Sequence, residues 1–134
     1  MACIEKIKSD LKKENEGVWI PFAEGIELKI AKARNPCYLD KLYALVQPHR
    51  QSIRDDTINA DALEGILKTV RAETVLLGWK NIEDKNGQTI SYSSKQALEF
   101  FNDPELKELY AFVVITSERT ELYRKDLVKE SEKN

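Results

Sequence analysis

Residues 18–30 read VWIPFAEGIELKI, and this stretch decides how the fold begins. Apolar and polar residues alternate on both sides of a central loop, which predicts a β-hairpin. A two-residue loop would set Phe22 opposite Glu27 and mix apolar with charged side chains across the strands. A three-residue loop at 23–25, with Gly25 in a left-handed conformation, keeps one face apolar. The predicted pairs are Phe22 with Ile26, Ile20 with Leu28, and Val18 with Ile30.

The residues around this hairpin are less regular. Pro21 cannot donate an amide hydrogen to a neighbouring strand, so its own strand is expected at the edge of a sheet. Residues 1–16 are highly charged and carry Ile4, Ile7 and Leu11 at spacings of three and four residues. This spacing fits either a short amphipathic helix or a frayed tail.

Two helices are predicted after the hairpin. Asn35 is an N-cap, Pro36 occupies the first helical position, and the first helix is expected to stop before Pro48. A polar loop is predicted at 49–56, and the second helix then runs from Thr57 or Asn59 to residue 77. Their apolar stripes are Leu39, Leu42, Tyr43 and Val46 on the first helix, and Leu63, Ile66, Leu67, Val70, Thr74 and Leu77 on the second.

The rest of the chain contains a turn and two further helix starts. Asn86-Gly87 is a type I′ hairpin signal between Ile82 and Ile90. Ser93 and Gln96 have the spacing of a capping box, which predicts a short helix through residue 101. An Asp-Pro-Glu sequence at 103–105 opens a final long helix. Its stripe is Leu106, Leu109, Tyr110, Val113, Thr116, Thr120, Tyr123 and Leu127.

These elements predict an α+β fold that is predominantly α-helical. An N-terminal β-hairpin packs on a small helical domain that contains a second short hairpin. We expect residues 1–134 to form a single domain with a polar tail at 129–134, because one hydrophobic core usually serves about 100–150 residues. The chain is 42% hydrophobic and 33% charged, which supplies enough apolar material for a core and argues against general disorder.

Composition excludes several classes of partner. The 21 basic and 23 acidic residues leave a net charge of −2, without the basic excess that nucleic-acid binding needs. The N-terminal residues lack the apolar region of a signal peptide, and no apolar run reaches the roughly 20 residues that span a bilayer. Cys3 and Cys37 are too few for a disulfide framework and lack zinc spacing, so we expect two free buried thiols in a reducing cytosol.

Catalytic motifs are also missing from the sequence. The single histidine, His49, has no serine or cysteine beside it to form a nucleophile pair. The five glycines form no phosphate-binding loop, and the acidic segment 83–87 lacks the later glutamate of a calcium loop. We therefore expect a protein that is not an enzyme and has no cofactor and no metal site.

Large apolar residues are the candidates for protein binding or self-association. The hairpin has one strongly apolar face, and the last helix carries a second apolar strip beside its main stripe. Either surface is explained by packing within the chain or by contact with another copy or a client chain. The candidates are Val18, Trp19, Ile20, Phe22, Ile26, Leu28, Ile30, Phe112, Ile115 and Leu122.

Two long segments resemble a known family. They are GVWIPFAEGIELKIAKARNPCYLDKL at 17–42 and AETVLLGWKNIEDKNGQTISYSSKQALEFFNDPELKELYAFV at 72–113. Their order resembles the tail assembly chaperones of long non-contractile-tailed bacteriophages (siphophages), in particular the short product made without a frameshift. The resemblance covers roughly residues 17–125 and consists of a spread pattern without any catalytic signature.

The resemblance implies a stoichiometric, non-catalytic chaperone. Such a protein binds the tape measure protein, helps recruit tail tube subunits, and is expected to form a homo-oligomer. It acts in the host cell cytoplasm and is absent from the mature virion. Two alternatives remain open: a structural virion component, such as a head–tail connector or minor tail protein, and a small regulator that binds one host protein.

Overall fold

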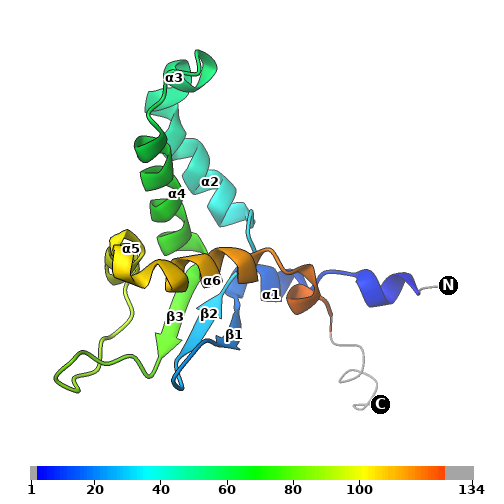
Figure 1. Cartoon of the computed structure of the whole chain (residues 1–134). Coiled ribbons are helices and arrows are strands. Elements are labelled where there is room, and N and C mark those ends of the chain that lie inside the picture. Colours follow the sequence, from blue (N-terminus) through cyan, green and yellow to red (C-terminus); the bar gives the residue numbers. More distant parts are fainter. Residues whose placement is uncertain (1–2, 126–134) are drawn as a thin grey trace.

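Three antiparallel strands in the order β1-β2-β3 form the sheet of the computed structural model, which describes residues 3–125 (Figure 1). The strands are β1 (Val18–Pro21), β2 (Glu27–Ile30) and β3 (Leu76–Lys80). The α-helices are α1 (Leu11–Glu16), α2 (Pro36–Val46), α3 (Arg50–Arg54), α4 (Ala60–Thr74), α5 (Ser94–Asn102) and α6 (Lys107–Ser117). Four 3₁₀ helices complete the described part: η1 (Ile4–Ile7), η2 (Gln47–His49), η3 (Pro104–Leu106) and η4 (Thr120–Tyr123). The predicted fold class, α+β and predominantly helical, is confirmed.

The hairpin has the predicted register. Val18 pairs with Ile30 and Ile20 with Leu28, while the Phe22 amide donates to the Ile26 carbonyl at 2.8 Å. Gly25 has a φ of 79°, the left-handed conformation that the three-residue loop requires. Strand β1 lies at the edge of the sheet, as its proline predicted.

Helix starts also follow the predicted cap chemistry. The Asn35 side chain accepts a hydrogen bond from the Tyr38 amide at 3.0 Å. Ser93 accepts from the Gln96 amide at 3.0 Å, which supplies the N-cap half of the predicted capping box. Each of these bonds satisfies an amide that the first helical turn leaves without a partner.

The predicted extension of the second helix to residue 77 is wrong. Helix α4 ends at Thr74, and Leu76 begins strand β3, which pairs antiparallel with β2. The run VLLGW contains no polar residue, and a short apolar run does not by itself distinguish a helix from a buried strand. The free edge of β2 makes this run a strand, because it offers hydrogen-bond partners to the residues that follow α4.

Two other local predictions need correction. The predicted loop at 49–56 contains helix α3 and part of η2. The final helix stops at Ser117, after which η4 brings Tyr123 back to the sheet, where its hydroxyl donates to the Ile30 carbonyl at 3.0 Å. Residue 127 of its predicted stripe, and the predicted tail at 129–134, lie outside the described residues.

The turn at Asn86-Gly87 is not of type I′. Only Gly87 has a positive φ, of 80°, whereas a type I′ turn requires positive φ at both central residues. The Asp84 carboxylate instead accepts the amides of Asn86 and Gln88 at 2.8 and 3.0 Å. The second hairpin is therefore short, with one isolated bridge between Glu83 and Thr89.

Helices α2 and α4 pack side by side and form, with α3 at their tip, a helical arm over residues 36–69 (Figure 1). On α2, the side chains of Tyr38, Leu42 and Leu45 point inward and pack in or against the core. Leu39 and Tyr43 of the predicted stripe are 50% and 69% exposed, because α2 meets α4 with its other side.

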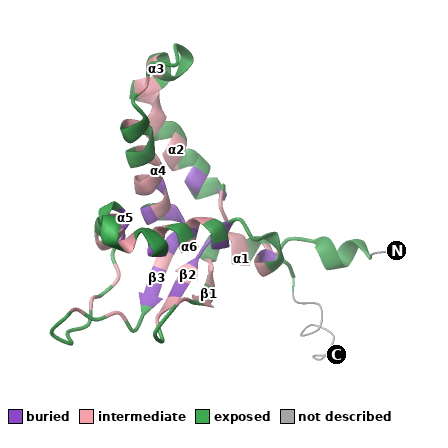
Figure 2. Ribbon diagram, in the orientation of Figure 1, coloured by how far each residue is buried: buried purple, intermediate pink, exposed green. Residues whose placement is uncertain are grey.

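The remainder of the described chain is the body, and it contains the core. Leu28 and Ile30 of β2 and Leu76 of β3 are fully buried, and Val113 of α6 is buried with them. Figure 2 shows the buried residues gathered at the sheet and the base of α4. The expectation of buried thiols is wrong: Cys3 precedes the protruding η1, and Cys37 lies on the outer side of the first turn of α2, so both are exposed.

Candidate protein-binding cleft

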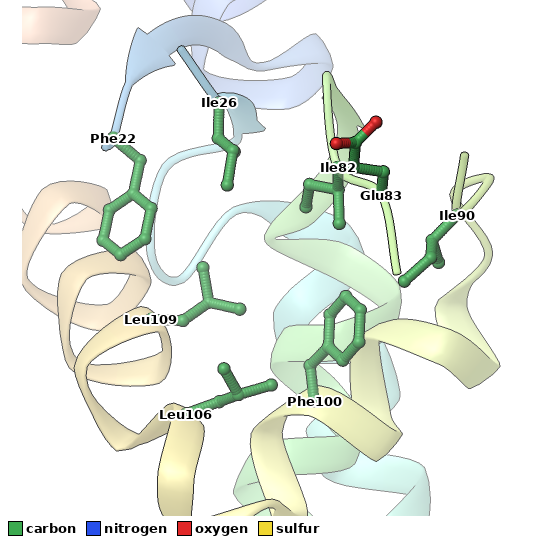
Figure 3. A pocket seen from close by; sticks show the side chains of 8 residues that line it. All are labelled: Phe22, Ile26, Ile82, Glu83, Ile90, Phe100, Leu106 and Leu109. Atoms are coloured by element: carbon green, nitrogen blue, oxygen red, sulfur yellow. The ribbon is translucent and has the colours of Figure 1, made fainter. Parts of the chain in front are cut away.

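An open, almost entirely apolar cleft lies between the hairpin tip, the segment after β3, and helices α5 and α6. Its volume is about 250 Å³. The side chains of this cleft converge from four separate segments (Figure 3). They are Phe22, Ile26, Ile82, Glu83, Ile90, Phe100, Leu106 and Leu109.

The hairpin wall is held by aromatic packing. The ring of Phe22 lies against the ring of Phe112 on α6, with centroids 4.9 Å apart and planes tilted by 57°. Such tilted contacts are favourable for aromatic pairs. They attach the hairpin tip to α6 and leave Ile26 at the mouth of the cleft.

The opposite wall is held by Trp79. Its indole N–H donates to the Ile90 carbonyl at 2.8 Å, and its ring packs against the rings of Tyr92 and Phe100. The Tyr92 hydroxyl donates to the Leu76 carbonyl at 2.6 Å. Burial raises the pKa of Tyr92, which keeps this hydroxyl protonated as a donor. These contacts hold this wall of the cleft in place.

The chemistry of the cleft is that of an apolar receptor. Glu83 is its single charged lining residue, and its carboxylate lies at the edge and points away from Phe100 and Leu106 (Figure 3). Within residues 3–125, no group of three or more His, Cys, Asp or Glu side chains is placed to hold a metal ion. The cleft can therefore receive apolar side chains and place a positive group beside Glu83.

The structure divides the predicted binding residues into four groups. Phe22 and Ile26 line the cleft and Phe112 packs against Phe22, whereas Leu28 and Ile30 are fully buried in the core. Val18, Ile20 and Leu122 are half-buried. Two of the candidates are exposed elsewhere: Trp19, at 40%, with the Lys80 ammonium 4.1 Å from its ring centre, and Ile115, at 64%.

Comparison with known proteins establishes the origin of the chain. The model of the YdaY prophage protein family matches residues 33–134. The chain belongs to the YdaY prophage protein family. No curated protein and no solved structure matches it. The match includes the arm, β3 and both cleft helices, whereas β1 and β2, which supply the hairpin wall, lie before the matched span.

Sequence reasoning missed much of the cleft in this prophage protein. Ile82 and Ile90 were recognised only as the ends of a short hairpin, and Leu106 and Leu109 only as part of a helical stripe. Their common signal is an apolar residue beside a turn or a helix start. That signal does not tell whether a side chain enters the core or a cleft, since both are apolar.

Other apolar side chains are exposed away from the cleft. The N-terminal segment carries Ile4, Ile7 and Leu11, which are 63%, 54% and 69% exposed. On the arm, the exposed large apolar residues are Leu39, Tyr43, Ile53 and Leu63. No helix among the described residues 3–125 has both the length and the apolar character to cross a membrane.

Proposed function

We propose that this prophage protein is a stoichiometric, non-enzymatic tail assembly chaperone that binds the tape measure protein and helps recruit tail tube subunits. The prophage family supports a phage setting. The resemblance of segments 17–42 and 72–113 to siphophage tail assembly chaperones supports the specific task. In this proposal the protein acts in the host cytoplasm and does not remain in the mature virion.

The open apolar cleft is the observation that carries this proposal. A cavity of ~150 Å³ holds a benzene-sized group, so about 250 Å³ leaves room for one or two large apolar side chains. An amphipathic helix presents such side chains along one face and binds in apolar grooves of this kind. A tape measure protein is long and helical and exposes such faces until the tail tube surrounds it.

A binding role also agrees with the chemistry of the lining residues. Seven of the eight are apolar, and the eighth is an exposed glutamate. None is a nucleophile, and general acid–base catalysis would need a carboxyl group desolvated within the cleft. A chaperone of this kind protects its client by covering apolar surface, one site for each bound segment.

The direct test is co-expression of the chain with the tape measure protein of the same phage, followed by affinity capture and light scattering. We expect a soluble complex that contains several copies of the chain. Leu106→Asp places a charge in the cleft and should reduce capture by more than about tenfold. Leu39→Asp is the matched control, because Leu39 is 50% exposed on the arm.

Two results would contradict the proposal. One is a tape measure protein that aggregates equally with and without the chain. The other is capture by the Leu106→Asp variant at the wild-type level while circular dichroism shows both variants folded. Presence of the chain in purified phage particles would favour a structural virion component instead. A third variant, Ile115→Asp, tests whether the exposed strip of α6 takes part in binding.

A further inference from the structure

The N-terminal segment, residues 3–13, exposes apolar side chains that no other part of the described residues 3–125 covers. Ile4, Ile7 and Leu11 are each more than half exposed. Ile4 and Ile7 lie three residues apart on the same side of the 3₁₀ helix η1, whereas Leu11 begins α1 after the non-helical residues 8–10. The segment extends away from the sheet (Figure 1), and Figure 2 shows it almost entirely exposed. Three large apolar groups left in water at one end of a protein are a feature of binding segments.

The base of this segment is fixed to the other end of the described chain. The Asp10 amide donates to the Tyr123 carbonyl at 2.7 Å, and the Lys125 amide donates to the Lys8 carbonyl at 3.1 Å. The Lys13 ammonium adds a bond to the Arg124 carbonyl at 2.9 Å. These bonds direct η1 outward, on the side of the molecule opposite the segment 81–92 that borders the cleft (Figure 1). The segment therefore does not reach the cleft of its own chain.

Charge makes the segment and the cleft complementary. Residues 3–13 contain four lysines and two acidic residues, Glu5 and Asp10. The segments that line the cleft, residues 22–27, 82–90 and 99–109, together contain eight acidic residues and two lysines. A positive apolar segment attracts an apolar cleft whose one charged lining residue is Glu83 and whose lining segments carry an acidic excess, and this attraction favours one orientation of docking.

We propose that the N-terminal segment of one copy inserts Ile4 and Ile7 into the cleft of a second copy, with its lysines beside Glu83 and the neighbouring acidic groups. The inference rests on the proposed function, because it assigns the occupant of the same cleft before the client arrives. Each copy has one segment and one cleft, so the contact is heterologous, and repeating it links further copies into a closed ring or an open chain. A client helix releases the segment by competing for the cleft.

Solution measurements on the full chain test this inference. Sedimentation velocity should show association that increases with protein concentration. The double substitution Ile4→Asp with Ile7→Asp should weaken it by about tenfold or more, because it puts charges into an apolar contact. Ile53→Asp is the matched control: Ile53 is 41% exposed on the arm and should leave association unchanged. Raising salt from about 0.05 M to about 0.5 M should weaken the contact, since its charges are exposed.

A peptide experiment locates the contact. A labelled peptide of residues 3–13 should bind the double variant, and anisotropy should report weaker binding to a triple variant that also carries Leu106→Asp. The same peptide with both isoleucines replaced by aspartate should not bind. Wild-type association by the double variant would overturn the inference, as would a peptide that binds both proteins equally or neither.

The two proposals fail in different ways. A double variant that captures the tape measure protein and binds the peptide, but no longer associates as the wild-type chain does, supports both proposals. A wild-type chain that stays monomeric at all concentrations while it captures the client overturns the inference alone. A chain that associates through the segment and never captures the client overturns the proposed function alone.

Discussion

The arm and the body of this protein differ in how many of their side chains are buried. Within the arm, residues 36–69, Tyr38 is the one buried side chain, whereas the body contains a continuous set of fully buried residues from β2, β3, α4 and α6. The arm depends on the contact between α2 and α4 and, at its base, on an exposed ion pair that joins its Lys41 to Glu73 of the body at 2.9 Å. Exposed ion pairs stabilise little, so the arm should open locally before the body unfolds.

Pairs of identical residues, one in each region, test this difference directly. Each pair places the same chemical change in the body and in the arm. If burial governs stability, the body member of every pair has the larger effect. Equal effects within a pair would mean that the arm is as well packed as the body.

The leucine pair should show the largest difference. Leu28→Ala removes a fully buried side chain from β2 and should cost about 2–5 kcal/mol of unfolding free energy. Leu39→Ala removes a side chain that is 50% exposed on α2 and should change stability by no more than about 0.5 kcal/mol. Urea unfolding followed by circular dichroism measures both, and a comparable loss in the two variants would refute the comparison.

The asparagine pair tests the junction between the two regions. Asn35 is buried, caps α2, and donates to the carbonyls of Lys32 and Thr74 at 2.8 and 3.0 Å. Asn35→Ala leaves these groups without their partner and should cost about 1–3 kcal/mol. Asn59 is exposed and caps only α4, so Asn59→Ala should cost about 0.5–1 kcal/mol.

Hydrogen exchange gives the second readout for this pair. Thr74 is the last residue of α4, so the Asn35 amide joins the start of α2 to the end of α4. Asn35→Ala should speed exchange throughout α2 and the end of α4, whereas the effect of Asn59→Ala should remain in the first turn of α4. Faster exchange confined to one turn in both variants would show that Asn35 acts only as a cap.

The parts of the fold that short-range chemistry determines could be predicted from the sequence. Gly25 and the alternation around it fixed the hairpin register, and the caps Asn35 and Ser93 marked two helix starts. Strand β3 could not be predicted, because Leu76 and Leu77 take their conformation from the free edge of β2, almost fifty positions earlier. The early end of α6 likewise depends on a distant group, the Ile30 carbonyl that receives Tyr123.

The cleft was predictable only in fragments for the same reason. Phe22 and Ile26 were recognised as apolar hairpin residues, and Phe112 as part of a second strip. Their meeting with Phe100 and Leu106 requires the hairpin, α5 and α6 to be placed in space. Apolar pattern alone assigned Leu28 and Ile30 to the same surface, although both belong to the core.

The tyrosine pair should show the smallest difference, and it adds a dependence on pH. Tyr123→Phe removes the hydroxyl that donates to the Ile30 carbonyl at 3.0 Å and should cost about 0.5–1.5 kcal/mol near neutral pH. Tyr43 is 69% exposed on α2, so Tyr43→Phe should leave stability unchanged within about 0.5 kcal/mol. Urea unfolding of both variants at neutral pH gives the first comparison.

Alkaline pH then separates the buried hydroxyl from the exposed one. Burial raises the pKa of Tyr123 above its ordinary value of 10.0, so the folded state holds this proton more tightly than the unfolded state does. The stability that follows is fully present below pH 10 and is lost as the pH rises above 10 toward the pKa of the folded state. The wild type should therefore lose its advantage over Tyr123→Phe in that range. An advantage over Tyr123→Phe that persists well above pH 10 would show that the Tyr123 hydroxyl is not held in the buried contact with Ile30.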